Sequence, residues 1–356
     1  MNTRAHLFWH LALVYLSLSA PCAHAAEPTL DIYWIDVEGG GGTLIITPAR
    51  QSILIDTGWP WGPSAARIRD AATDAGVNRI DYLILTHFHI DHFGGAAALS
   101  TLLPVGTVLD NGIPDHDPDG QDNERFLKSI KPYREFIAER RMLIQPGETL
   151  PLLQADSAIP ISLRFMGARQ HFVHPPGMGG PNSLCADSTR QERDTSDNAN
   201  SVVSLLQFGS FKFYDGGDLT WNMEGELVCP TNSIGRVDVY QVDHHGLDIS
   251  NNPLLIRSLA PTVSVMNNGP RKGGAKATVA NLRSVSSIQT MYQVHKDLRG
   301  GEEFNTEEQH IANLEEKCEG NYIKCSVDPS GKSYTISIPA KGFSKTYQTR
   351  TTEAGQ

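Results

Sequence analysis

The stretch DYLILTHFHIDHFGGAAAL, residues 81–99, places three histidines and an aspartate between an apolar run and two glycines. Its first half reads as a buried strand and its glycines open a helix, so the polar residues lie on the loop between them. His87 and His89 are two positions apart in extended chain, so their rings project from the same side and can bind one cation together. Asp91 and His92 follow where the chain turns, and can face a second cation or a water between two cations. The loop therefore predicts a metal site directly after a strand.

Strand-type and helix-type runs alternate on both sides of this loop. Apolar runs rich in Ile, Val, Leu and aromatic residues predict strands over 29–37, 42–48, 51–58, 81–86, 236–246 and 262–268, and a pair of strands within 200–218. Helical periodicity predicts helices over 64–75, 94–103, 252–260 and 277–285. Because this alternation repeats twice, we expect an α/β protein with two sheets packed face to face and helices outside.

The N-terminus differs in composition from the rest of the chain. A basic residue, an apolar run over 7–18 and small residues before position 26 predict a signal peptide at 1–25. The apolar run, at about twelve residues, is too short to span a bilayer. We therefore expect an exported protein, periplasmic or extracellular, with no membrane span after cleavage. The mature chain, 26–356, is predicted to form a single domain in which 300–356 is a C-terminal extension containing a hairpin.

Composition and charge limit the classes of function. The 356 residues are 40% hydrophobic and 20% charged, which predicts a packed globular protein rather than a disordered one. The formal net charge of −10 repels polyanions unless a local basic patch overcomes it, so the composition gives no strong indication of nucleic-acid binding. The glycine run at 39–42 lacks a nucleotide-loop pattern and precedes a strand-type run, so we expect a tight hairpin there.

Four cysteines remain after signal cleavage, namely Cys185, Cys229, Cys318 and Cys325, and they allow three pairings in an oxidising compartment. We expect Cys318 to pair with Cys325, because CEGNYIKC contains a turn-forming Gly-Asn pair and can close a short hairpin. No CxxC spacing occurs, so we do not expect these cysteines to form a zinc site.

The pattern HxHxDH at 87–92 resembles the signature of the metallo-β-lactamase superfamily. Similar blocks are LIDTG at 54–58, GGD at 216–218 and DHHG at 243–246. Within the superfamily the chain is most similar to the ComEC-like hydrolase domains, in blocks that here read DVEGGGG, NANSVV and HHGL. The resemblance implies a four-layer αβ/βα sandwich of two mixed sheets, with one or two zinc ions, or manganese or iron, at the sheet edges.

The resemblance also implies roles for single residues. Asp218 is expected to bridge two cations, and His244 to be the last ligand of the second metal. The full expected ligand set is His87, His89, Asp91, His92, Asp218 and His244. His245 is the alternative to His244 as ligand, or else contacts a ligand or the substrate. Asp91 is expected to orient the attacking water, which makes it the main catalytic residue with His245 as the second, and Asp56 in the LIDTG block is expected behind the ligands.

The chain departs from the family pattern at several positions. Where many members have a third histidine for the first metal, this chain reads SDNANS, so Asn198 or Asp197 occupies that place and weakens the first site. The histidines of HFVHPP at 171–176 are alternative ring donors. A GHP block of the ComEC-like group is replaced by GGAKAT, which brings Lys276 near the substrate, and His295 follows a strand that approaches the same pocket.

These features favour hydrolysis through an activated water. Zinc lowers the pKa of bound water to about 7, so no serine or cysteine nucleophile is required, and no GxSxG pattern is present. The ComEC-like blocks and the basic stretch at 271–276 favour a phosphodiester-type substrate over other small molecules. Two alternatives stay open: a hydrolase of lactones, esters or β-lactams, and a catalytically silent metal-binding protein.

Overall fold

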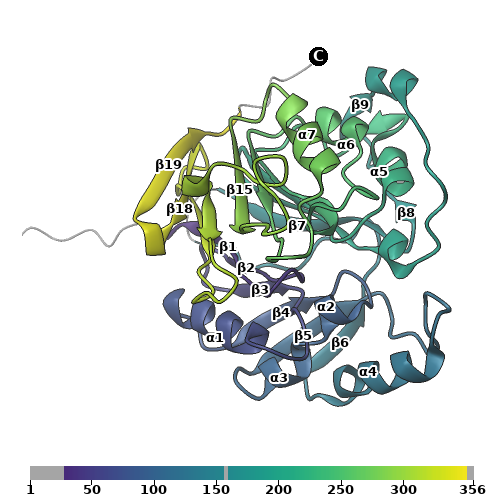
Figure 1. Cartoon of the computed structure of the whole chain (residues 1–356), viewed down its shortest axis with the longest axis vertical. Coiled ribbons are helices and arrows are strands. Elements are labelled where there is room, and N and C mark those ends of the chain that lie inside the picture. The colour runs from purple at the N-terminus through teal and green to yellow at the C-terminus, as the bar shows by residue number, and fades with distance from the viewer. Residues whose placement is uncertain (1–27, 156–158, 351–356) are drawn as a thin grey trace, which may run out of the picture.

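The structure is a computed structural model that describes residues 28–155 and 159–350 (Figure 1). The predicted signal peptide lies outside these described residues. Within the described ranges, no helix combines the length and apolar character needed to cross a bilayer. Two mixed β-sheets pack face to face, and helices cover their outer faces.

The first sheet consists of nine strands: β1 (Leu30–Trp34), β2 (Thr43–Ile46), β3 (Ser52–Ile55), β4 (Ile80–Ile84), β5 (Val105–Asp110), β6 (Arg140–Leu143), β17 (Ile323–Val327), β18 (Ser333–Ile338) and β19 (Phe343–Gln348). Their order is β19-β18-β17-β1-β2-β3-β4-β5-β6. The strands from β3 to β6 pair in parallel, and those from β19 to β3 pair antiparallel. The three C-terminal strands therefore extend this sheet beyond β1.

The second sheet consists of eight strands: β7 (Ile161–Ala168), β8 (His171–Phe172), β10 (Val203–Phe208), β11 (Phe211–Asp215), β13 (Val239–Gln241), β14 (Val263–Met266), β15 (Thr290–His295) and β16 (Ile311–Asn313). Their order is β16-β15-β14-β13-β11-β10-β7-β8, with parallel pairing from β11 to β16. A separate short pair joins β9 (Gly180–Pro181) to β12 (Thr231–Asn232).

Helices α1 (Ser64–Asp74), α3 (Ala96–Ser100) and α4 (Asn123–Glu135) pack on the first sheet, and α5 (Trp221–Val228), α6 (Pro253–Leu259) and α7 (Lys276–Ser284) pack on the second (Figure 1). The short helix α2 (Ile90–Phe93) lies within the polar loop that follows β4. Short 3-10 turns are η1 (Ser183–Asp187), η2 (Asp197–Asn200), η3 (Asp243–Gly246), η4 (Glu308–His310) and η5 (Pro339–Lys341). This arrangement confirms the predicted α/β sandwich of two mixed sheets with outer helices.

Strand alternation in β1 shows why the sheets are buried on both faces. Leu30, Ile32 and Trp34 belong to the core between the two sheets, whereas Tyr33 packs toward the helices of the first layer. Because successive strand residues point to opposite faces, a strand between two apolar layers is apolar at most positions. The exception in β1 is Asp31, which is buried and forms an ion pair with Lys324 at 3.0 Å. Trp34 Nε1 also donates to Gln241 Oε1 at 3.0 Å, which links the two sheets through a polar contact.

The disulfide prediction was wrong. Cys185 pairs with Cys229, 44 positions apart, and this bond joins η1 to the residue that follows α5. Cys318 and Cys325 are free thiols. Cys325 lies on β17 in the core between the sheets, whereas Cys318 lies on the preceding loop with its Sγ 3.2 Å from Asp36 Oδ2. The two side chains therefore have different surroundings, and the turn between them does not bring them together.

Candidate metal centre

The polar loop after β4 lies where strands of both sheets end. Asp56 follows β3, and the loop that carries His92 follows the neighbouring parallel strand β4. Asp218 follows β11, and His245 follows β13, which pairs with β11 in parallel. Since parallel strands end at the same edge of a sheet, the turns that carry these side chains meet between the two sheets.

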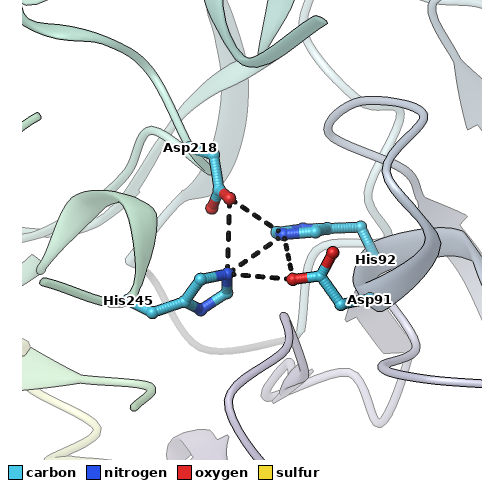
Figure 2. Close-up of side chains that lie close together, drawn as sticks. All are labelled: Asp91, His92, Asp218 and His245. Atoms are coloured by element: carbon cyan, nitrogen blue, oxygen red, sulfur yellow. Dashed lines mark hydrogen bonds and ion pairs between the residues drawn. The ribbon is translucent and has the colours of Figure 1, made fainter. Parts of the chain in front are cut away.

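Four buried side chains form what we call the four-donor centre: Asp91, His92, Asp218 and His245 (Figure 2). One donor atom from each lies within 4.8 Å of the others. Asp218 Oδ2 is 3.2 Å from His92 Nε2 and 3.3 Å from His245 Nε2. Asp91 Oδ2 is 3.5 Å from His92 Nε2 and 3.3 Å from His245 Nε2. Two imidazole nitrogens and two carboxylate oxygens are a donor set suited to zinc and related divalent metals.

The outer nitrogens of both rings have acceptors, which leaves the inner nitrogens for a cation. His92 Nδ1 donates to Asp56 Oδ2 at 2.7 Å, and His245 Nδ1 donates to the carbonyl oxygen of Asn267 at 3.0 Å. A neutral ring that keeps its proton on Nδ1 presents a lone pair at Nε2, and the two Nε2 atoms are 3.2 Å apart. A metal-binding histidine usually has this kind of partner on its second nitrogen, so the residues fit a divalent cation.

His87 lies beside the four-donor centre and is fully buried, with its Nε2 3.9 Å from Asp218 Oδ2. Its Nδ1 contacts Thr86 Oγ1 at 3.1 Å, and its Nε2 has no hydrogen-bond partner within the described residues. Burial holds the pKa of His87 well below its ordinary value, so the ring is neutral and Nε2 can accept a cation. His89 differs, because its Nε2 lies 2.9 Å from Asp119 Oδ2 instead.

The structure separates the two consecutive histidines of the DHHG block. His245 belongs to the four-donor centre, whereas His244 Nδ1 lies 3.1 Å from Ser250 Oγ and His244 Nε2 lies 3.4 Å from Asp218 Oδ2. Burial lowers the pKa of His244 to about 4, so this ring is neutral at physiological pH. His245 is therefore a member of the four-donor centre, and His244 lies beside it against the same Asp218 carboxylate.

Charges inside the centre keep its carboxylates ionised. Burial alone would raise the pKa of Asp218, but His245 and His92 lower it well below its ordinary value. Burial would likewise raise the pKa of Asp91, and His92, His245 and Lys272 lower it well below its ordinary value. Burial opposes a charge on His92, but Asp218 and the other nearby carboxylates raise its pKa well above the usual range. A cation that binds His92 Nε2 would therefore displace the proton on that nitrogen. Ionised carboxylates are what a cation requires as ligands.

Lys272, rather than the expected Lys276, is the lysine at the centre. The Lys272 ammonium forms an ion pair with the Asp91 carboxylate and lies 5.0 Å from the centre of the Trp59 ring. Lys276 begins α7, is largely exposed and pairs with Glu303 at 3.3 Å. The Gly-Gly turn between the two lysines separates them, so that Lys272 contacts Asp91 and Lys276 contacts Glu303.

In the segment expected to replace the third histidine, the Asp197 side chain binds the backbone of the loop after β4. Asp197 Oδ2 accepts a hydrogen bond of 2.6 Å from the backbone N–H of Phe88, which fixes the loop that carries His87. Asn198 is buried and its Oδ1 has no partner among the described residues. Three of the expected site residues outside the four-donor centre contact its members: Asp56, His87 and His244. Four others have neighbours outside the centre: His89, Asn198, Lys276 and His295.

Residues 38–177 match the sequence model of the Metallo-beta-lactamase superfamily. The chain is 26% identical over 247 residues to Recombination protein 2 of Haemophilus influenzae, a match that covers 68% of this chain and 25% of that protein. It is 24% identical over 272 residues to ComE operon protein 3 of Bacillus subtilis, a match that covers 72% of this chain and 30% of that protein. Over 85 residues it is 39% identical to the atrochrysone carboxyl ACP thioesterase of Passalora fulva, covering 24% of each chain. The chain thus spans less than a third of the length of each of these relatives.

Proposed function

Because the chain carries a domain of the metallo-beta-lactamase superfamily, we propose that it is a hydrolase that uses one or two divalent cations to cleave phosphodiester-type substrates. Zinc is the first candidate for the cation, and manganese and iron are the alternatives. The observation that carries the proposal is the convergence of two imidazole nitrogens and two carboxylate oxygens in the four-donor centre. A divalent cation bound there would lower the pKa of a water and stabilise negative charge on the substrate.

The residues of the centre divide into two roles. The four-donor centre would hold one cation, and the bare Nε2 of His87 offers a further nitrogen toward Asp218 for a second. Asp91 is the carboxylate that can also accept a hydrogen bond from the attacking water and orient it. Lys272, whose ammonium contacts Asp91, supplies a positive charge for an anionic oxygen of the substrate.

An aromatic surface beside Lys272 supports a substrate with both an anionic and a flat apolar part. Trp59 and Trp61 stack with ring centres 5.0 Å apart and planes 28° apart, and Trp61 is 58% exposed. Lys272 lies over the Trp59 ring, so the cation and the aromatic surface are adjacent. An exposed tryptophan offers a stacking surface to a ring of the substrate. A phosphodiester with an aromatic or heterocyclic group combines both features.

A second candidate activity is hydrolysis of esters, thioesters, lactones or β-lactams. It is supported by the 39% identity over 85 residues to the thioesterase of Passalora fulva and by the net charge of −10, which disfavours large polyanionic substrates. A catalytically silent metal-binding protein is the third. The two enzymatic candidates use the same centre and differ in the substrate that it accepts.

We also propose that the protein is exported to the periplasm or the extracellular space. The Cys185–Cys229 disulfide supports this proposal, because such bonds form and persist in oxidising compartments. We expect the protein isolated from the periplasm or the medium to contain oxidised cysteines. We expect no oxidised cysteines in protein from the cytoplasmic fraction. Protein retained in the cytoplasm with Cys185 and Cys229 both reduced would contradict it.

The test of function compares substrates at a known metal content. Zinc-loaded protein should hydrolyse bis(p-nitrophenyl) phosphate faster than nitrocefin, a lactone panel or a thioester, and chelation should abolish that activity until zinc is restored. Preferential turnover of a thioester or lactone would select the second candidate. A metal-free preparation with full activity would contradict the metal-dependent mechanism itself.

A further inference from the structure

A second group of metal-type donors lies apart from the four-donor centre and shares no residue with it. Asp36, His295 and Cys318 bring one donor atom each to within 4.8 Å of one another. Asp36 follows β1 in the first sheet, His295 ends β15 in the second sheet, and Cys318 lies on the loop before β17. Asp36 and His295 are fully buried, and Cys318 is partly buried. Three distant parts of the chain therefore meet at this point.

The His295 ring presents a bare nitrogen there. His295 Nδ1 lies 2.8 Å from the carbonyl oxygen of Lys296, and a carbonyl can only accept, so Nδ1 carries the proton. His295 Nε2 therefore has a lone pair, and it is buried with no hydrogen-bond partner in the part of the chain that the structure describes. A buried polar atom without a partner destabilises the fold, and a bound cation is one way to satisfy it.

The charges around this group balance a dication. Asp36 Oδ2 lies 3.2 Å from Cys318 Sγ and 3.3 Å from Arg67 Nη1. Arg67 Nη1 is in turn 2.8 Å from Glu38 Oε1, so the charges of Arg67 and Glu38 offset each other. Cys318 Sγ donates its proton to Asp36 Oδ2, and a divalent ion that binds the sulfur would release this proton to solvent. The Asp36 carboxylate and the resulting Cys318 thiolate would then supply two negative charges to the ion. Thiolate, imidazole and carboxylate are the three donor types that zinc accepts in proteins.

From this geometry we propose that Asp36, His295 and Cys318 form a second, zinc-type metal site that joins the two sheets and the loop before β17. An ion bound to these residues would close long segments of chain, because the residues lie at positions 36, 295 and 318. A crosslink that closes such long loops strongly restricts the unfolded chain. The binding free energy of such an ion becomes part of the free energy of folding.

The site would also hold the glycine loop that flanks the four-donor centre. This loop, 39–42, begins three residues after Asp36. A Cβ added at Gly41 would lie 2.6 Å from Asp56 Oδ2 and 2.8 Å from His92 Nδ1, so the loop backbone packs directly against the histidine of the centre. Fixing Asp36 fixes the start of this loop. The second ion therefore has a structural role and does not contact the substrate.

Cobalt substitution tests the proposal, because a thiolate bound to Co²⁺ absorbs in the near ultraviolet and the four-donor centre contains no sulfur. Cobalt-loaded wild-type protein should show this charge-transfer absorption, and Cys318→Ser should lose it. Cys325→Ser is the matched control, since Cys325 is the other free thiol and is buried in the core away from these donors. Asp218→Asn, in the four-donor centre, should keep the absorption.

Elemental analysis of the zinc-loaded proteins provides a second measurement. Cys318→Ser should hold one ion per chain fewer than Cys325→Ser, and His295→Gln should show the same loss. Wild-type protein with no thiolate-to-cobalt absorption would overturn the proposal even if the variants failed to fold. Equal metal content in Cys318→Ser and Cys325→Ser would also overturn it. Neither result bears on hydrolysis, so the failure of this site and that of the proposed function are distinguishable.

Discussion

His245 reaches the carboxylates of the four-donor centre because the backbone turns through an unusual conformation. His244 and His245 have φ values of 53° and 54°, in the left-handed region that non-glycine residues rarely adopt. Each such residue costs about 1 kcal/mol or more, so contacts must compensate for it. His244 contacts Ser250, and His245 donates to the carbonyl of Asn267. The strained turn sets the two rings in different directions, with ring planes 69° apart.

This geometry predicts a difference between two alanine variants. His245→Ala should lower the metal content of the four-donor centre, because it removes one of the four donors. His244→Ala should retain more of that metal, because the His244 ring lies beside Asp218 and outside the set of four. Elemental analysis, carried out in a Cys318→Ser background so that only this centre is counted, provides the measurement. The opposite order of metal loss would assign the ligand to His244.

Asp91→Asn should damage turnover far more than folding. The carboxylate lies among His92, His245 and Lys272, where its charge matters, and an amide keeps the shape but loses the charge. We expect turnover to fall by roughly two or more orders of magnitude, with a Tm within a few degrees of wild type after zinc is restored. Steady-state kinetics and thermal unfolding decide this. Asp115→Asn, at an exposed carboxylate, is the control and should leave turnover unchanged.

Turnover of Asp91→Asn within a factor of about three of wild type would place Asp91 outside the reaction. The carboxylate would then act only as a ligand or as a partner of Lys272. A large loss of Tm in the same variant would instead indicate a structural role for the loop after β4.

At the scale of elements, Asp238 ties three segments together at the start of β13. Asp238 Oδ2 accepts from the backbone N–H of Lys212 at 2.9 Å, and Oδ1 accepts from that of Arg350 at 3.1 Å. These contacts join β13 to β11 and to the chain after β19. Burial raises the pKa of Asp238 to about 6, although both backbone donors act in the opposite direction.

The raised pKa gives stability a predictable dependence on pH. Asp238 ionises near 3.8 in the unfolded chain and at about 6 in the folded one, so the folded state holds the proton to higher pH. Its contribution to stability is therefore present below the unfolded pKa and is lost as the pH rises through the folded pKa. Relative to Asp238→Asn, wild type should lose up to about 3 kcal/mol between about pH 4 and about pH 7. Urea unfolding at a series of pH values measures it, and parallel curves for the two proteins would contradict it.

At the scale of the whole molecule, the Cys185–Cys229 disulfide encloses the segment that delivers Asp218. The bond closes a loop of 44 positions, within which β10, β11 and α5 lie. A crosslink of this span stabilises a protein by about 2–4 kcal/mol, chiefly by restricting the unfolded chain.

Reduction of this bond should therefore lower the free energy of unfolding by about 2–4 kcal/mol while metal binding is retained. A double variant, Cys185→Ser with Cys229→Ser, should behave as the reduced protein does and should no longer respond to reductant. Denaturant unfolding with and without a thiol reductant measures the difference, and Cys325→Ser is the control that should keep the full response. Wild-type protein insensitive to reductant would show that the disulfide does not form.

Local sequence patterns predicted the elements that carry the centre. The predicted helix at 64–75 is α1, and the strand predicted at 81–86 is β4, because apolar periodicity and the turn residues that bound it act within one segment. The loop after β4 was predicted as a metal site for the same reason, since its ligand types lie within six positions. The β10–β11 pair and the single strands β13 and β14 also follow such patterns. The strands β17–β19 were missed as part of the first sheet, because their pairing with β1 joins the two ends of the chain.

By itself, then, the sequence determined the α/β sandwich and the loop rich in metal-type donors, whose spacing is local. Only the tertiary structure decided which donors meet. The choice of His245 depends on a left-handed turn, that of Lys272 on the Gly-Gly turn that follows it, and the position of His295 beside Cys318 on contacts between segments from separate sheets. Such contacts depend on how the two sheets pack and where the chain turns. The spacing of residues along the sequence does not predict them. The pairing of Cys185 with Cys229 depends on tertiary packing for the same reason.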